Sequence, residues 1–524
     1  MASANQPVRR VTIVGGGTAG WMTAAVLSRW LSKVEIKLIE SDEIGIIGVG
    51  EATIPGIRNY VGLAGLDPLK MISETKATFK LGIQFVDWGA PGETYIHGFG
   101  KIGHDLLWLH PHQLWMAARD RVPDAIQPFD YYALNCVASL QNKFTFPDRR
   151  NPGSPLAHID YAYHFDASFF AKYLRAESEA QGVERVEGRI VEVIRNSETG
   201  FVEKVRLTDG REVEGDLFVD CSGMRALLIG DALGVGYEHW NEWLICDRAM
   251  AVPCESVSPL TPYTRSTARK AGWQWRIPLQ HRIGNGYVYS SSMISDDEVA
   301  TTLLDNLDGK PMADPRPVRF SPGRRLKSWD KNVVAIGLSS GFLEPLESTS
   351  IHLIQTGITK LLALFPARGF SEPDIAEYNR QSQFEYEDVR DFIIAHYKVT
   401  RRTDDPFWDH VRTMAIPDSL QERFDLFRSS GRWFKHGAAE LFGEESWVQV
   451  LLGQGFEAKP DPVAQFVSDE ELVAFLNDIA EVNEEVAASM PDHGEFVANL
   501  PPTSAVQQGA ETDMETFDLA SVHR

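Results

Sequence analysis

The sequence predicts an α/β fold organised around a parallel sheet, and three observations support this class. Val11–Val14 is a short β-branched run, which is typical of a buried parallel strand. A glycine-rich turn follows it directly, and Trp21–Trp30 then has the composition of a helix. A second apolar run, Val34–Ile39, ends in Glu40, so that strand, turn, helix and strand alternate as in a βαβ unit.

The glycine-rich turn has the spacing G-x-G-x-x-G at Gly15, Gly17 and Gly20. The first glycine permits the tight turn, the second lets the backbone approach a pyrophosphate, and the third lets the helix pack close to the strand. Glu40 follows Gly20 by twenty residues, which is where an acid that binds a ribose belongs. We therefore predict a dinucleotide site, with a glycine turn in an ordinary α/β unit as the alternative.

Later segments complete the predicted architecture. Val186–Val219 alternates in short β-like runs broken by turn signals, and Gly272–Pro278 suggests a strand of a second, mostly antiparallel sheet. A sheet inserted in this way predicts a Rossmann-like FAD-binding fold of the flavoprotein monooxygenase type with a mostly helical C-terminal region. We expect the FAD-binding module to span 1–370, the helical region 371–500, and a flexible tail 501–524.

The composition excludes several classes of partner. The 524 residues carry 73 acidic and 51 basic side chains, a net charge of −22, which disfavours binding to nucleic acid or to an anionic membrane. No apolar run reaches membrane-spanning length. The four cysteines lack C-x-x-C spacing and predict buried thiols of a cytoplasmic protein, not a metal site.

Four parts of the sequence allow more specific predictions. Ile44–Pro55 places three glycines among β-branched residues, which favours a strap against a flat flavin ring over an irregular surface loop. Tyr161–Arg175 is predicted as an amphipathic helix led by Asp166. Lys80, at the mouth of a predicted strand, is either a surface-reaching edge residue or a functional group in a desolvated site. Glu347–Ser350 is either a capping box or a site for an anion and flavin.

These motifs together resemble the tryptophan-halogenase family of flavin-dependent halogenases, from the first strand to about Trp447. The glycine fingerprint is one of four matches. Trp273–Pro278 matches the signature W-x-W-x-I-P, and Lys80 matches in its Phe-Lys context. Phe342–Ser350 matches F-x-x-P-x-x-S-x-G, with Ser350 in place of the usual glycine. If that position needs a positive φ, the serine is strained there.

The resemblance implies a division of labour between two places. Reduced FAD, O2 and chloride or bromide yield hypohalous acid, which travels through a tunnel to Lys80 beside an electron-rich aromatic substrate. Lys80 then either hydrogen-bonds that acid or forms a haloamine, and Glu347 is the second catalytic residue. Trp273 and Trp275 keep the substrate away from the flavin. Because the chain has one dinucleotide fingerprint, we expect a separate NAD(P)H-dependent flavin reductase to supply FADH2.

The resemblance also implies a set of binding residues. Thr349 and Ser350 would bind halide through backbone N–H groups, and Pro55, His97 and Phe99 would contact the substrate. The cofactor contacts would be Gly15, Gly17, Thr18, Ala19, Gly20, Glu40, Val49, Ala52, Thr53, Ile190, Leu338 and Ile351.

The substrate end departs from the family pattern. The tyrosine pair and the Phe-Trp pair that clamp free tryptophan are missing from Phe434–Leu452. We therefore predict another electron-rich aromatic, such as an indole without the amino-acid group, a phenol, or a larger peptide-like or polyketide substrate. Two other functions stay open: an aromatic hydroxylase of the same fold, and a flavin-binding protein without catalysis.

Overall fold

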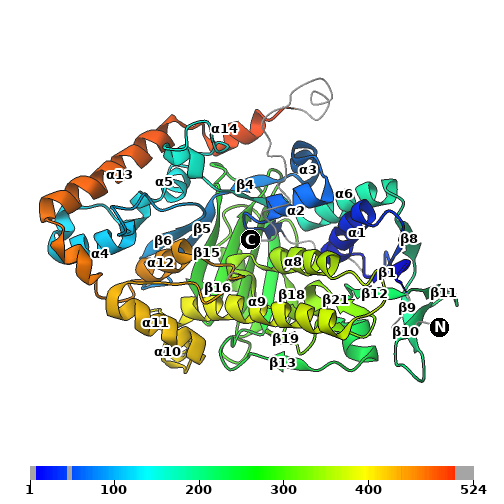
Figure 1. The fold of residues 1–524 in the computed structure, drawn as a ribbon. Coiled ribbons are helices and arrows are strands. Elements are labelled where there is room, and N and C mark those ends of the chain that lie inside the picture. Colours follow the sequence, from blue (N-terminus) through cyan, green and yellow to red (C-terminus); the bar gives the residue numbers. More distant parts are fainter. Residues whose placement is uncertain (1–6, 44–49, 438, 502–524) are drawn as a thin grey trace.

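The computed structural model describes residues 7–43, 50–437 and 439–501. Its first layer is a six-stranded sheet in the order β20-β21-β12-β1-β2-β8, at one end of the molecule in Figure 1. Strand β1 is parallel to both β2 and β12, which confirms the predicted parallel unit. The strands are β1 (Arg10–Val14), β2 (Glu35–Glu40), β8 (Glu184–Glu187), β12 (Leu217–Asp220), β20 (Trp329–Asp330) and β21 (Val333–Ala335).

Helix α1 (Thr18–Trp30) follows the glycine turn and covers this sheet. A Cβ atom on Gly20 would lie 1.9 Å from the carbonyl oxygen of Gly15, so only glycine allows the helix to start this close to the turn. Gly15 itself has φ +113°, and a Cβ there would lie 2.2 Å from the carbonyl oxygen of Cys221. The turn is therefore fixed by sterics before any ligand binds.

The second layer is a seven-stranded sheet in the order β18-β14-β17-β16-β15-β5-β6. Strand β16 pairs antiparallel with β17 along its whole length, as the sequence predicts. Only the β15–β5 pair is parallel in this sheet. The strands are β5 (Gly82–Val86), β6 (Thr94–Gly98), β14 (Arg248–Cys254), β15 (Tyr263–Arg269), β16 (Gly272–Pro278), β17 (Ile283–Tyr289) and β18 (Arg316–Arg319).

A small sheet of β3 (Gly50–Ala52), β7 (Ala162–Asp166) and β4 (Thr78–Lys80) lies beside the large sheet, because β3 contacts β16 and β17 and β4 contacts β15. The predicted helix over Tyr161–Arg175 is therefore wrong in its first turn. Residues 162–166 are buried and pair on both sides, with β3 and with β4, and this tertiary pairing overrides the local helical pattern. Asp166 does lead the helix, because its side chain caps α6 (Ala167–Ala180).

Two further three-stranded sheets lie at the edges, in the orders β11-β10-β9 and β13-β19-β22. Their strands are β9 (Ile190–Arg195), β10 (Val202–Leu207), β11 (Glu212–Glu214), β13 (Tyr237–His239), β19 (Gly323–Arg325) and β22 (Gly341–Phe342). Nearer the site, the chain passes from a 3-10 turn at Pro345–Glu347 into helix α8 (Ser350–Ala363).

Helices surround the large sheet. The long α9 (Glu372–Lys398) packs against β20 and also against α10, α11 and α12, so it connects the dinucleotide half with the far end of the molecule. Helices α4, α5 and α13 gather at that far end in Figure 1. The helices named here are α4 (Pro111–Arg121), α5 (Leu134–Leu140), α10 (Pro406–Thr413), α11 (Asp418–Ser430), α12 (Glu444–Gly453) and α13 (Asp469–Ser489).

The remaining helices are short: α2 (Ile57–Ala64), α3 (Pro68–Thr75), α7 (Asp296–Asp305) and α14 (His493–Ala498). All four cysteines are buried and unpaired. In the part of the chain that is described, no helix has both the length and the apolar character to cross a membrane. The predicted tail, 501–524, lies outside the described residues except for Pro501.

Candidate active site

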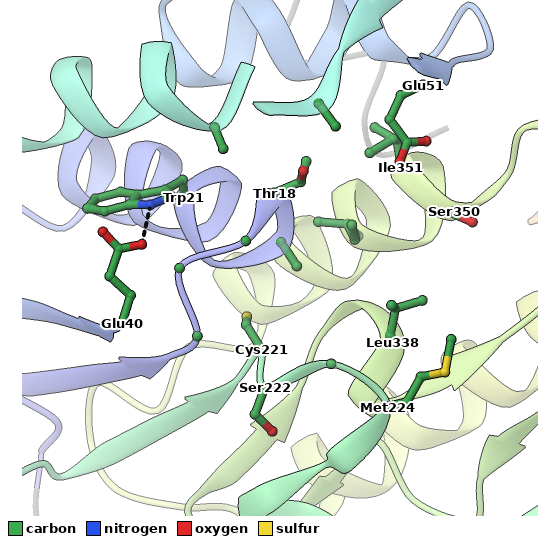
Figure 2. A pocket seen from close by; sticks show the side chains of 18 of the residues that line it. Thr18, Trp21, Glu40, Glu51, Cys221, Ser222, Met224, Leu338, Ser350 and Ile351 are labelled. Atoms are coloured by element: carbon green, nitrogen blue, oxygen red, sulfur yellow. Dashed lines mark hydrogen bonds between the residues drawn. The ribbon is translucent and has the colours of Figure 1, made fainter. Parts of the chain in front are cut away.

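A cavity of about 640 Å³ opens where β1 and β12 end and α1 begins. The glycine turn lines one side of it, and residues of the large sheet and of α8 line the other. Figure 2 shows Trp21 and Glu40 at one end and Glu51, Ser350 and Ile351 at the other. The cavity therefore extends from Glu40 at the end of β2 to Glu51 and the start of α8.

Glu40 is held in place by its neighbours. The indole nitrogen of Trp21 donates to Glu40 Oε2 over 3.3 Å, and Arg175 Nη1 lies 3.4 Å from Glu40 Oε1. Arg185 donates to the same Oε1. These contacts fix a carboxylate at the end of β2, where the βαβ geometry brings a ribose.

The structure brings most predicted cofactor residues to this cavity. Thr53 and Gly20 do not line it, because Thr53 faces the neighbouring buried site and Gly20 packs on the turn. Val49 lies outside the described residues. The predicted residues that line the cavity are Gly15, Gly17, Thr18, Ala19, Glu40, Ala52, Ile190, Leu338 and Ile351.

Gly17 shows that the residues present fit a dinucleotide such as FAD. It has an ordinary extended backbone, φ −76° and ψ −172°, and a Cβ built on it meets no atom within 4 Å. Sterics inside the protein therefore do not require glycine at this position. The space that a side chain would fill borders the cavity at the start of α1, where free N–H groups favour phosphate.

Gly17→Ala is expected to weaken FAD binding at least about tenfold, a loss of about 1.4 kcal/mol, without changing the melting temperature of the apoprotein. The added methyl group would meet no protein atom within 4 Å and would project toward the cavity space in which we expect the pyrophosphate. Flavin-fluorescence titration and thermal unfolding measure the two quantities. Gly15→Ala is the contrasting variant, because it should lower the melting temperature; unchanged FAD affinity in Gly17→Ala would contradict this placement.

Lys80 lies behind the cavity wall, in a second, fully buried group of polar residues. It ends β4, has no exposed surface, and its Nζ donates to the Thr53 carbonyl oxygen over 3.0 Å and to Ser348 Oγ over 2.9 Å. The Phe99 ring centroid lies 5.2 Å from Nζ. Burial lowers the pKa of Lys80 to about 7, although the nearby Glu347 carboxylate opposes the shift.

Glu347 is also fully buried and lies between two histidines. His97 Nδ1 lies 3.1 and 3.0 Å from the two carboxylate oxygens, and His396 Nε2 lies 2.7 Å from Oε1. Burial alone would raise the pKa of Glu347, but attraction to His97 and contact with His396 outweigh it and lower this pKa to about 2. The carboxylate is therefore ionised at neutral pH.

Ser348 lies between the cavity and the buried polar group around Lys80. Its hydroxyl accepts from Lys80, and the residue also lines the cavity. It adopts the left-handed conformation with φ +58°, which turns the chain between Glu347 and the start of α8. Lys80 and Glu347 themselves do not line the cavity. Ser348 thus contacts the buried lysine and also borders the cavity.

The replacement of glycine by Ser350 causes no backbone strain. Ser350 is the first residue of α8 and is not among the residues with positive φ. It lines the cavity, whereas Thr349 at the N-cap is fully buried and its Oγ1 has no hydrogen-bond partner among the described residues. The left-handed residue in this segment is Ser348, two positions earlier.

Two of the predicted substrate residues, His97 and Phe99, lie on the Lys80 side. The His97 and Phe99 rings are 6.4 Å apart at 76°, and His97 faces Glu347. Pro55 is half-buried at the start of α2. Trp275 lines the cavity, but Trp273 does not, because its indole nitrogen donates to Glu344 over 2.8 Å behind the sheet.

Sequence reasoning missed three residues at these sites. His396 contacts Glu347 from α9, and no local spacing connects the two. Glu51 lines the cavity, its side-chain carboxyl makes no hydrogen bond with the described residues, and burial raises its pKa to about 7. Glu344 accepts from Trp273 and Tyr397, and burial raises its pKa to about 7. Of the three, Glu51 had a signal, since it lies within the predicted strap.

The fold and the cavity define a class of protein: a dinucleotide-binding flavoprotein with an inserted, mostly antiparallel sheet. A second buried site adjoins the cavity. Among the described residues, no group of three His, Cys, Asp or Glu side chains could hold a metal ion.

Comparison with known proteins identifies the family. The family model for tryptophan halogenases matches residues 10–469, so the chain belongs to the tryptophan-halogenase family of flavin-dependent halogenases. The tryptophan 6-halogenase SttH of Streptomyces toxytricini is 36% identical and covers 86% of this chain and 91% of its own.

Two solved structures are similar over nearly the whole length. The flavin-dependent halogenase Xcc4156 of Xanthomonas campestris superposes with a TM-score of 0.91 at 47% identity, covering 95% of this chain and 99% of its own. BrvH, a flavin-dependent halogenase of Brevundimonas sp. BAL3, gives 0.89 at 46% identity, covering 94% and 99%.

Proposed function

We propose that this enzyme makes hypohalous acid from O2 and halide in the flavin cavity, and that Lys80 and Glu347 direct the halogen onto an electron-rich, indole-like aromatic ring. The observation that carries the proposal is the buried lysine and buried ionised glutamate directly behind Ser348. When bound, reduced FAD supplies the electrons that activate O2. The protein's own contribution is to hold charge in advance in a fully buried site.

The halide is proposed to bind at the start of α8. Backbone N–H groups at a helix N-terminus favour an anion, and Ser350 borders the cavity there. The unpartnered Oγ1 of Thr349 supports a ligand at this point. Separate reactions with chloride and with bromide decide which halide is preferred.

The substrate is proposed to lack the amino-acid group. Within the stretch Phe434–Leu452, the buried Glu440 pairs with Arg423 over 2.7 Å. Both side chains are buried, and Arg423 also lies over the Trp447 ring. This carboxylate is already neutralised, which leaves it unsuited to bind a substrate ammonium.

The reduced flavin is proposed to come from a separate NAD(P)H-dependent flavin reductase. Among the described residues, one G-x-G-x-x-G fingerprint, at Gly15–Gly20, leads from a strand into a helix, and no second one does so that could bind NAD(P)H. The buried, unpaired cysteines support a cytoplasmic location, where thiols stay reduced.

Mass spectrometry of products tests the proposal. The enzyme is incubated with FAD, NADH, a flavin reductase, bromide and a panel of indoles and phenols. We expect a bromine-substituted product that is lost when either the reductase or bromide is omitted. Addition of oxygen without bromine would instead indicate an aromatic hydroxylase, and product without reductase would remove the proposed partner.

A further inference from the structure

His396 makes an unusual contact with Glu347. Its Nδ1 lies 2.8 Å from the backbone carbonyl oxygen of Phe392, and a carbonyl only accepts, so Nδ1 carries a hydrogen. In a neutral ring, Nε2 then holds a lone pair. That lone pair would lie 2.7 Å from a carboxylate oxygen, and two lone pairs at this distance repel. One additional proton is therefore required between His396 and Glu347.

The surroundings indicate which group carries it. Each oxygen of Glu347 lies within 3.1 Å of a histidine nitrogen, which is the setting of an ionised carboxylate, so we place the proton on the imidazole. Nε2 makes no aligned hydrogen bond with the described residues, so the contact acts mainly through charge. Aromatic rings of Phe85, Trp88 and Phe392 enclose His396, and this apolar setting strengthens the attraction.

Other titratable groups surround this pair. His97 on β6 contacts both Glu347 oxygens, Tyr95 lies on the same strand, and the Glu344 carboxyl accepts from Trp273 and Tyr397 nearby. Lys80, on β4, has a pKa lowered to about 7, so above neutral pH it is largely an uncharged amine. A buried carboxylate without a full positive partner is costly.

We propose that His396 is a positioning residue that carries the positive charge balancing Glu347, and that it thereby leaves Lys80 free as an amine. An amine can react with hypohalous acid, because its nitrogen lone pair forms the N–X bond, one N–H proton leaves and the hydroxide of HOX departs as water. The N–X bond then breaks as the ring carbon takes X⁺ and returns a proton to nitrogen. An ammonium has no lone pair for this step.

The proposed role of His396 rests on the proposed function, but its first test does not require halogenation activity. Long-range ¹H–¹⁵N NMR of the histidine rings, without flavin or substrate, reports the protonation of each nitrogen. At pH 7.5 we expect His396 to have both nitrogens protonated, and to become the neutral Nδ1–H form in Glu347→Gln. His396→Gln assigns the signals. A neutral His396 in the wild type would overturn the proposal.

His164 provides an internal control for this measurement. Its two nitrogens contact Thr78 and Thr264 hydroxyls, and burial lowers its pKa well below the usual value. It should remain neutral in every variant. A changed His164 signal would indicate a rearranged core and not a loss of charge.

The second test uses the pH profile. His396→Gln keeps an N–H donor but removes the charge, so the proton that His396 held passes to the Lys80 and Glu347 pair. We expect flavin binding and flavin oxidation to stay unchanged, KM for the aromatic to change little, and kcat to fall at least about tenfold. The acid limb of the halogenation profile should also move to higher pH.

A merely structural role for His396 would lower activity without moving that limb, and such a result would overturn the proposal. If the wild type itself halogenates nothing, the proposed function fails, whereas the NMR result still decides the charge on His396.

Discussion

Lys80→Met is expected to reduce halogenation about a thousandfold or more while reduced flavin continues to be oxidised at the normal rate. Methionine has a similar length but offers neither an amine lone pair nor an N–H donor to hypohalous acid. The cavity should be unaffected, because Lys80 does not line it. Oxygen consumption and hypohalous acid trapping measure the first step, and chromatography of the aromatic product measures the second. Undiminished product would exclude Lys80 from catalysis.

The same variant provides its own control for folding, because it should be more stable than the wild type at neutral pH. Lys80 has a pKa of about 7 in the folded protein and an ordinary value of 10.5 when unfolded. The unfolded chain thus binds more protons between these pH values, so the stability of the wild type rises with pH from 7 to 10. The destabilisation caused by burying the Lys80 ammonium reaches its full size below pH 7. Denaturant unfolding should show the advantage of Lys80→Met shrinking by about 2 kcal/mol from pH 7 to pH 9.

Glu347→Gln is expected to lower halogenation about a hundredfold or more, again with flavin oxidation retained. The amide keeps the shape of the side chain but loses the negative charge that faces His97 and His396. It can no longer stabilise a cationic ring intermediate. Because the carboxylate also supports the Lys80 ammonium, the pKa of Lys80 should fall further below 7 in this variant.

Glu344→Gln is the matched control. Glu344 is an equally buried glutamate three residues away, but it accepts from Trp273 and Tyr397 and does not line the cavity. We expect its halogenation rate to stay within about threefold of the wild type, because a glutamine oxygen accepts the same bonds. Equal losses in both variants would mean that general disturbance of the core, and not the Glu347 charge, explains the effect.

Local patterns predicted the dinucleotide half well. The strand, turn and helix around Gly15 to Gly20 depend on contacts between close neighbours in the chain, and the structure confirms each element. The helix predicted over Tyr161–Arg175 was wrong at its start, because residues 162–166 form a strand that pairs with β3 and β4. Local periodicity carries no information about such distant partners.

The sequence by itself determined the first parallel strands and the glycine turn, since short-range sterics and hydrophobic period fix these. Its family motifs also identified Lys80 and Glu347 as candidate catalytic residues. Only the tertiary structure decided that Lys80 is fully buried, that Ser348 lies between it and the cavity, and that His396 contacts Glu347. Protonation follows from desolvation and from charges a few ångströms away. The groups that create these conditions come from β4, β6, α9 and the turn before α8, which are brought together only in the folded chain.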